Sequence, residues 1–84
     1  MKPNKDPITA TLRVMNRTDA DTVRALFETY VEELPAQFRK DEWLRTLAVP
    51  ADLYLTFPNR RKYGRFMREL AVSRTKIKVI AGGD

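Results

Sequence analysis

Basic side chains gathered in the last third of the chain are its clearest candidates for chemistry. The segment between Asn59 and Lys78 contains eight basic residues and one acidic residue, Glu69. The bases are Arg60, Arg61, Lys62, Arg65, Arg68, Arg74, Lys76 and Lys78. Guanidinium and ammonium groups at this density bind phosphate oxygens or an acidic protein surface, although a charged face kept for solubility has the same composition.

Acids are concentrated earlier in the chain. The chain as a whole has 16 bases and 11 acids, which is a net charge of +5. Between Asp19 and Pro35, however, five acids stand against one base, Arg24. Two segments of opposite sign suit a charge-complementary protein partner or head-to-tail self-association, so the oligomeric state is left open.

The groups on which most small enzymes depend are missing. The chain has no cysteine and no histidine, which excludes Ser–His and Cys–His nucleophile pairs, zinc hydrolysis and imidazole acid–base catalysis. The acid pair Glu32–Glu33 is directed to different faces of its predicted helix, and no glycine-rich phosphate loop occurs. We therefore expect a non-catalytic binding module with no metal, no cofactor and no small-molecule substrate.

Length and hydropathy predict one domain. The chain has 84 residues, of which 43% are hydrophobic, so it is larger than the domains that usually need a metal or a disulfide to fold. It has no apolar run of about 18 residues, and its first ten residues carry charges and prolines where a signal peptide is apolar. We expect a cytoplasmic domain without membrane contact, ordered over about residues 8–81 between short flexible termini.

The first elements follow from apolar periodicity. Alternating apolar residues, namely Ile8, Ala10, Leu12 and Val14, predict a half-buried strand over residues 8–16. Apolar residues then recur at helical spacing across residues 23–34, and Pro35 ends this helix or starts a new turn. Candidates for the N-cap are Thr18, Asp19 and Asp21.

Residues 36–49 fit two patterns. Phe38, Leu44 and Leu47 recur at helical spacing, whereas the segment from Trp43 to Val49 alternates as a strand does. We favour the strand, which makes residues 50–52 a hairpin turn into a further strand at residues 53–57. In that further strand Leu53, Leu55 and Phe57 face inward, and Tyr54 and Thr56 face outward.

The basic run is the outer face of a second predicted helix. Asn59 is a suitable N-cap, and the inner face is apolar. Gly64 costs about 1 kcal/mol relative to alanine inside a helix, which indicates close packing or close approach of a ligand, and we favour packing. Residues 75–82 predict a last strand with Ile77 and Val79 inward. The predicted core includes Leu26, Tyr30, Leu34, Leu55, Phe57, Phe66 and Leu70.

The resulting order of elements predicts an α+β, ferredoxin-like βαββαβ fold, with an antiparallel sheet and two helices on one face. Residues 8–81 resemble an RNA recognition motif in length and order. The segment LRVMN followed by DADTVRALFETY resembles that family's first strand and helix, and LYLTFPNRRKYGRFMREL is similar to its third strand and second helix.

The resemblance implies binding of RNA or another single-stranded nucleic acid on the open sheet face, where bases stack on aromatic side chains. Tyr54 matches one such aromatic position, whereas Arg13 and Asp52 occupy the other two. Arg13 would stack on a base in place of a ring, with Lys76 and Lys78 beside it. The second helix would form a separate basic surface on the opposite side, made of Arg61, Arg65 and Arg68.

Protein binding is the alternative function. Small phage-encoded inhibitors, anti-CRISPR proteins among them, include compact ferredoxin-like folds that block a surface of a larger nucleic-acid-processing enzyme. The small size, the charge and the lack of catalytic groups fit an inhibitor or adaptor of this kind as well as they fit a nucleic-acid-binding module.

Overall fold

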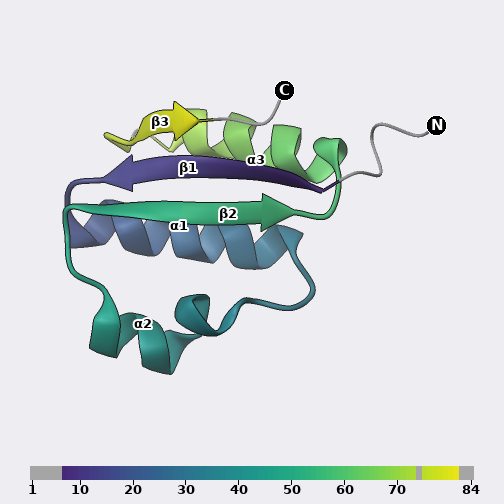
Figure 1. Cartoon of the computed structure of the whole chain (residues 1–84). Coiled ribbons are helices and arrows are strands. Elements are labelled where there is room, and N and C mark those ends of the chain that lie inside the picture. The colour runs from purple at the N-terminus through teal and green to yellow at the C-terminus, as the bar shows by residue number, and fades with distance from the viewer. Residues whose placement is uncertain (1–6, 74, 82–84) are drawn as a thin grey trace.

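The first strand of the chain forms the centre of the sheet. In the computed structural model, which describes residues 7–73 and 75–81, β1 (Ile8–Val14) pairs antiparallel with β2 (Ala51–Phe57) on one side and with β3 (Lys78–Ala81) on the other (Figure 1). β2 and β3 are therefore parallel to each other with β1 between them, and α3 (Arg60–Val72) connects them as in a split βαβ unit. The predicted α+β class is confirmed. Residues 1–6 and 82–84, which contain the termini expected to be flexible, lie outside the described residues.

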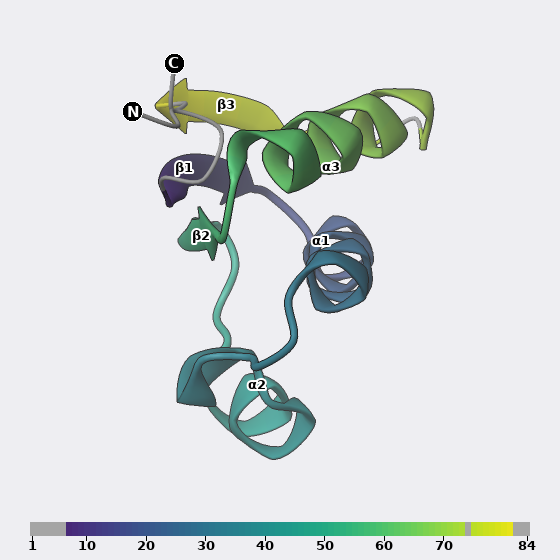
Figure 2. The same ribbon diagram turned by 90° about the vertical axis from the view of Figure 1, so that its right-hand side faces the viewer.

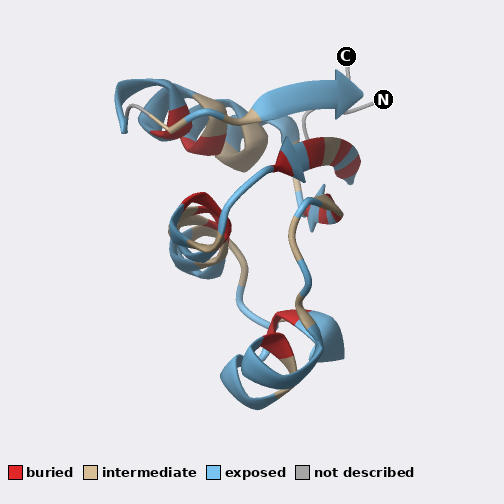
Figure 3. Ribbon diagram, turned by 90° about the vertical axis from the view of Figure 1, so that its left-hand side faces the viewer, coloured by how far each residue is buried: buried red, intermediate tan, exposed pale blue. Residues whose placement is uncertain are grey.

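Helices cover one face of this sheet. α1 (Arg17–Tyr30) and α3 lie side by side against it, and no helix of residues 7–73 and 75–81 covers its other face (Figure 2). The predicted alternation explains this arrangement, because every second residue of β1 is buried and its neighbours face solvent or are half-buried (Figure 3). Phe57 lies at the centre of the core, with ring centroids 4.9 Å from Phe66, 5.2 Å from Phe27 and 5.7 Å from Tyr63.

Asparagine side chains begin both long helices. The side-chain oxygen of Asn59 accepts a hydrogen bond from the backbone N–H three residues on, at 2.9 Å, which confirms this predicted N-cap. Asn16 caps α1 in the same way by accepting from the N–H of Asp19 at 2.8 Å. The predicted caps Thr18, Asp19 and Asp21 are wrong, since all three lie inside the helix.

α1 ends earlier than the apolar spacing predicts. The last helical residue is Tyr30, and Pro35 instead starts a short 3-10 turn, η2 (Ala36–Phe38). Leu34 therefore lies outside the helix. Of the predicted core, four residues are buried, and three are half-buried and pack against the core. The buried ones are Leu55, Phe57, Phe66 and Leu70, and the half-buried ones are Leu26, Tyr30 and Leu34.

The strand favoured for residues 36–49 is wrong. This segment forms η2 and a short helix, α2 (Lys40–Thr46), so the hairpin expected at residues 50–52 is absent and β2 begins directly at Ala51. The sheet of the described residues consequently has three strands instead of the four predicted. Acids in the first turn of α2 and a base in its last turn suit the helix dipole.

Contacts with α1 hold this helical segment in place. The indole N–H of Trp43 donates to the carboxylate of Asp21 at 2.7 Å, and the guanidinium of Arg24 donates to the carbonyl of Phe38 at 2.8 Å. The rings of Phe38 and Trp43 are buried and stack on each other, with centroids 5.6 Å apart. Helical spacing was therefore the correct alternative for this segment. It also predicted that Leu44 faces inward, whereas this side chain is 61% exposed.

The last strand is shorter than predicted. β3 spans only Lys78–Ala81, and a register shift interrupts its pairing with β1. Val79, predicted to face inward, is 45% exposed, whereas Ile77 precedes the strand and packs half-buried against the core. β3 thus covers little of the core.

Candidate nucleic-acid interface

The open sheet face carries an ion pair near the end of β1 and the start of β2. Strand register aligns Lys78, Arg13 and Asp52 in one row across the sheet. Nε of Arg13 donates to Oδ1 of Asp52 at 2.8 Å, and Nη2 donates to Oδ2 at 3.3 Å. Tyr54 lies two register pairs away, opposite Thr11, and is 58% exposed.

This ion pair reduces the positive charge that the sheet face offers to a ligand. The hydrogen bond from Arg13 holds the pKa of Asp52 below its ordinary value, and the same bond raises the pKa of Arg13. Lys78 is exposed beside the pair. Lys76 lies before β3, where its backbone N–H donates to the buried Asp19 at 3.1 Å. The sheet face is therefore weakly basic.

Replacing Asp52 by asparagine is expected to destabilise the protein at neutral pH but not in acid. Because the folded-state pKa lies below the ordinary value of 3.8, the ion pair stabilises the fold above about pH 3.8, and this contribution is lost as the pH falls through the folded-state pKa. Urea unfolding at a series of pH values from 7 down to 2 measures the difference between wild type and Asp52→Asn. A difference that stays constant over this whole range, or one that Glu33→Gln reproduces, would contradict this account.

The outer face of α3 has a stronger and simpler positive charge. At about 100° per residue, Arg61, Arg65 and Arg68 lie within an arc of about 60° and span about 10 Å along the helix axis. All three side chains are exposed, and no ion pair joins them to an acid within residues 7–73 and 75–81. We call these three residues the arginine face.

The one acid of α3 is hydrogen-bonded to another helix. Glu69 accepts a hydrogen bond from the hydroxyl of Tyr30 on α1 at 2.7 Å. This bond raises the pKa of Tyr30 above its ordinary value. The carboxylate thus links the two helices. It lines a shallow hollow together with Arg65 and Arg68, but within the described residues it forms no ion pair with either of them.

Gly64 lies about 40° outside the arc of the arginine face, and its position is exposed. A Cβ atom added there would have no neighbouring heavy atom within 4 Å. Close packing, the explanation favoured from the sequence, is therefore wrong, because nothing in the described chain packs on this glycine. The explanation that stays open is close approach of a ligand.

The seven predicted site residues form two groups. Arg13, Tyr54 and Lys78 belong to the sheet, Lys76 lies just before β3, and Arg61, Arg65 and Arg68 belong to α3 in the helix layer (Figure 2). Sequence reasoning treated Arg13 as a free cation and missed its pairing with Asp52. Only the strand register, which joins residues 39 positions apart, brings these two together.

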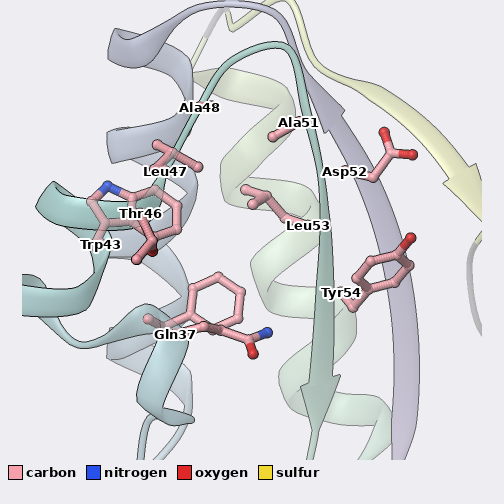
Figure 4. Close-up of a pocket in the computed structure, with 10 residues that line it drawn as sticks. Gln37, Trp43, Thr46, Leu47, Ala48, Ala51, Asp52, Leu53 and Tyr54 are labelled. Carbon is pink, nitrogen blue, oxygen red and sulfur yellow. The ribbon is translucent and has the colours of Figure 1, made fainter.

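A hollow of about 300 Å³ lies beside β2, between this strand and the η2–α2 segment (Figure 4). Leu53 extends from the β2 wall, and Trp43 and Leu47 form the opposite wall. Gln37 and Thr46 supply polar groups at the rim. We call this the β2-edge hollow. Nothing in the sequence indicated it, because its two walls come together only when residues 36–46 fold as helices.

Comparison of the chain with models of known protein families, with curated proteins and with solved structures gives no match. None of the helices in residues 7–73 and 75–81 combines the length and the apolar composition needed to cross a membrane.

Proposed function

We propose that this protein is a non-catalytic module that binds the phosphate backbone of nucleic acid through the arginine face of α3. The observation that carries the proposal is the exposure of three neighbouring guanidinium groups without an acidic partner in the described residues. Planar guanidinium groups bind phosphate oxygens through paired hydrogen bonds. The weakly basic sheet face, where Asp52 balances Arg13, is the less favourable surface for an anion.

The shape of this face favours a duplex over a single strand. An exposed α-helix fits the major groove of B-DNA, which is about 12 Å wide. Basic side chains on such a helix reach the phosphates at the borders of the groove. Single-strand binding commonly uses aromatic stacking platforms, and the exposed Tyr54 lies on the face of β2 that points away from the helices, since it alternates with the buried Leu53 and Leu55. Binding through phosphates alone is strongly salt-dependent and weakly selective for sequence.

In this proposal, the domain is a variant of the RNA recognition motif. The split βαβ unit formed by β2, α3 and β3 supports a ferredoxin-like origin in which η2 and α2 stand in place of the second strand. In such a variant the nucleic-acid-binding surface moves from the sheet to the second long helix.

The test is fluorescence anisotropy with a labelled duplex DNA and a labelled single-stranded RNA across a salt series. Three phosphate contacts predict a slope of about −2.7 for log K against log salt with the duplex. The variant Arg61→Ala/Arg65→Ala/Arg68→Ala is expected to lose at least tenfold in affinity and most of this slope. The charge-matched control Arg39→Ala/Lys40→Ala/Arg45→Ala should change the affinity less than about threefold.

Three outcomes would overturn the proposal. Equal losses in both triple variants would mean that net charge, rather than the arginine face, governs binding. A loss confined to Tyr54→Ala would move the site to the sheet. No binding to either nucleic acid at about 50 mM salt would leave an acidic protein surface as the partner, as expected of an inhibitor or adaptor.

Gly64→Ala is expected to act in opposite directions on stability and on binding. Alanine should raise the free energy of unfolding by about 0.5–1 kcal/mol, because glycine is entropically unfavourable inside a helix and the added methyl group meets open space. The same methyl group would hold a phosphate backbone away from α3 and weaken duplex binding. Urea unfolding and anisotropy on the same preparation measure both effects. A stabilised variant with unchanged affinity would show that Gly64 has no part in binding.

A further inference from the structure

We infer that the free edge of β2 binds an extended peptide, which adds to the sheet as a fourth strand and places apolar side chains in hollows beside β2. This surface is separate from the arginine face, so the inference does not rest on the proposed function. β2 pairs only with β1 among the described strands, which leaves the backbone groups along its other edge without a strand partner.

The β2-edge hollow supplies the first side-chain pocket. Its apolar lining consists of Phe38, Trp43, Leu47, Ala48, Ala51 and Leu53. The stacked aromatic pair forms its floor on the helical side, and the hydrogen bond from Trp43 to Asp21 fixes the indole in place. A rigid apolar pocket beside an unpaired strand edge is the arrangement that peptide-binding domains use in strand addition, where main-chain bonds give affinity and pockets give specificity.

A second hollow, of about 400 Å³, lies where β2 ends. Pro7, Val31, Phe57 and Pro58 supply its apolar lining, and Glu32 and Lys62 are the charged residues that border it. From Leu53 to Phe57 a strand advances about 13 Å at 3.3 Å per residue. A peptide strand alongside β2 therefore reaches both hollows with side chains at positions i and i+4, which point to the same face.

The surroundings decide which occupant fits. The η2–α2 segment lies beyond the β2 edge (Figure 2) and lines the β2-edge hollow together with β2, so the sheet of a second copy would meet it, whereas a single extended strand is narrower than a sheet. Glu32 and its neighbour Glu33 are exposed and form no ion pair within the described residues. The occupant is accordingly an extended peptide with apolar residues at i and i+4 and a Lys or Arg near the end that reaches Glu32.

The test is selection of peptides from a displayed library of random 12-residue sequences on the full chain. Selected peptides, made synthetically, are then titrated against two matched pairs of variants. Ala48→Trp fills the β2-edge hollow, and Ala25→Trp adds the same side chain to an exposed position of α1. Glu32→Lys reverses a charge at the second hollow, and Glu33→Lys reverses one beside it. Amide hydrogen exchange of β2 and β3 is measured with and without peptide.

We expect selected peptides to carry apolar residues four positions apart and a basic residue, and to slow amide exchange in β2 but not in β3. Ala48→Trp should lower the affinity for these peptides at least tenfold, and Glu32→Lys should lower it at least threefold. Each control variant should bind them within about twofold of the wild-type affinity. The inference is overturned if selection yields no peptide that binds tighter than about 1 mM, if Ala48→Trp binds as well as wild type, or if β2 gains no protection. It is equally overturned if the chain self-associates through this edge, since the occupant would then be a second copy.

Discussion

Replacing Phe57 by alanine is expected to lower the free energy of unfolding by about 3–5 kcal/mol, the range found for buried aromatic residues. Phe57 is completely buried, and its ring contacts Phe27 from α1 together with Tyr63 and Phe66 from α3. It is the residue at which both helices meet the sheet. The alanine variant therefore loses contacts in every layer of the domain and leaves a cavity.

Chemical unfolding followed by far-UV circular dichroism measures this loss. Since domains of this size are stable by only about 4–13 kcal/mol, Phe57→Ala will be close to unfolding, and Phe57→Leu provides a milder variant expected to lose about 1–2 kcal/mol. Val72→Ala, at a position 75% exposed, is the control and should stay within about 0.5 kcal/mol of wild type. A small loss in Phe57→Ala would mean that the core is not organised around this ring.

Replacing Trp43 by alanine is expected to lower the free energy of local unfolding of α2 by about 3–5 kcal/mol, while the sheet stays folded. Trp43 is 3% exposed, stacks on Phe38 and donates a hydrogen bond to Asp21. These contacts, with the bond from Arg24 to the Phe38 carbonyl, hold η2 and α2 against α1. Without them the segment has few other attachments, because α2 is only seven residues long.

Native-state amide hydrogen exchange distinguishes local from global effects of this change. We expect α2 amides to exchange about 10²–10⁴ times faster in Trp43→Ala, with β1 amides nearly unchanged. Trp43→Phe keeps a ring against Phe38 but loses the indole donor, so its effect should be about 1–3 kcal/mol. Equal acceleration in α2 and β1 would mean that this segment unfolds only together with the whole domain.

Elements whose pattern lies in their own residues could be predicted from the sequence. β1 alternates over seven residues, and α3 combines an asparagine cap with an apolar face, so both were placed within one or two residues. α2 could not be placed in this way. Its helical state depends on partners in α1, 14 residues before Phe38 and 22 before Trp43, and no local period encodes those contacts.

The candidate site was predictable to a similar extent. The arginine face follows from helical spacing alone, so Arg61, Arg65 and Arg68 lie together as expected. The ion pair of Arg13 with Asp52 depends on strand register, and the β2-edge hollow depends on where α2 packs. The open space around Gly64 was likewise invisible in the sequence, since glycine in a helix is equally compatible with close packing and with exposure.

The central position of β1 has a consequence for folding during synthesis. β1 is made first, yet its partners follow much later, since Val14 pairs with Ala51 and Arg13 pairs with Lys78. At about 5–20 residues per second, the ribosome needs about 2–9 s to extend the chain from the end of β1 to the end of β2. During that interval an apolar strand has no sheet to join. Nascent chains are therefore expected to expose β1 to chaperones or to aggregation until β2 emerges.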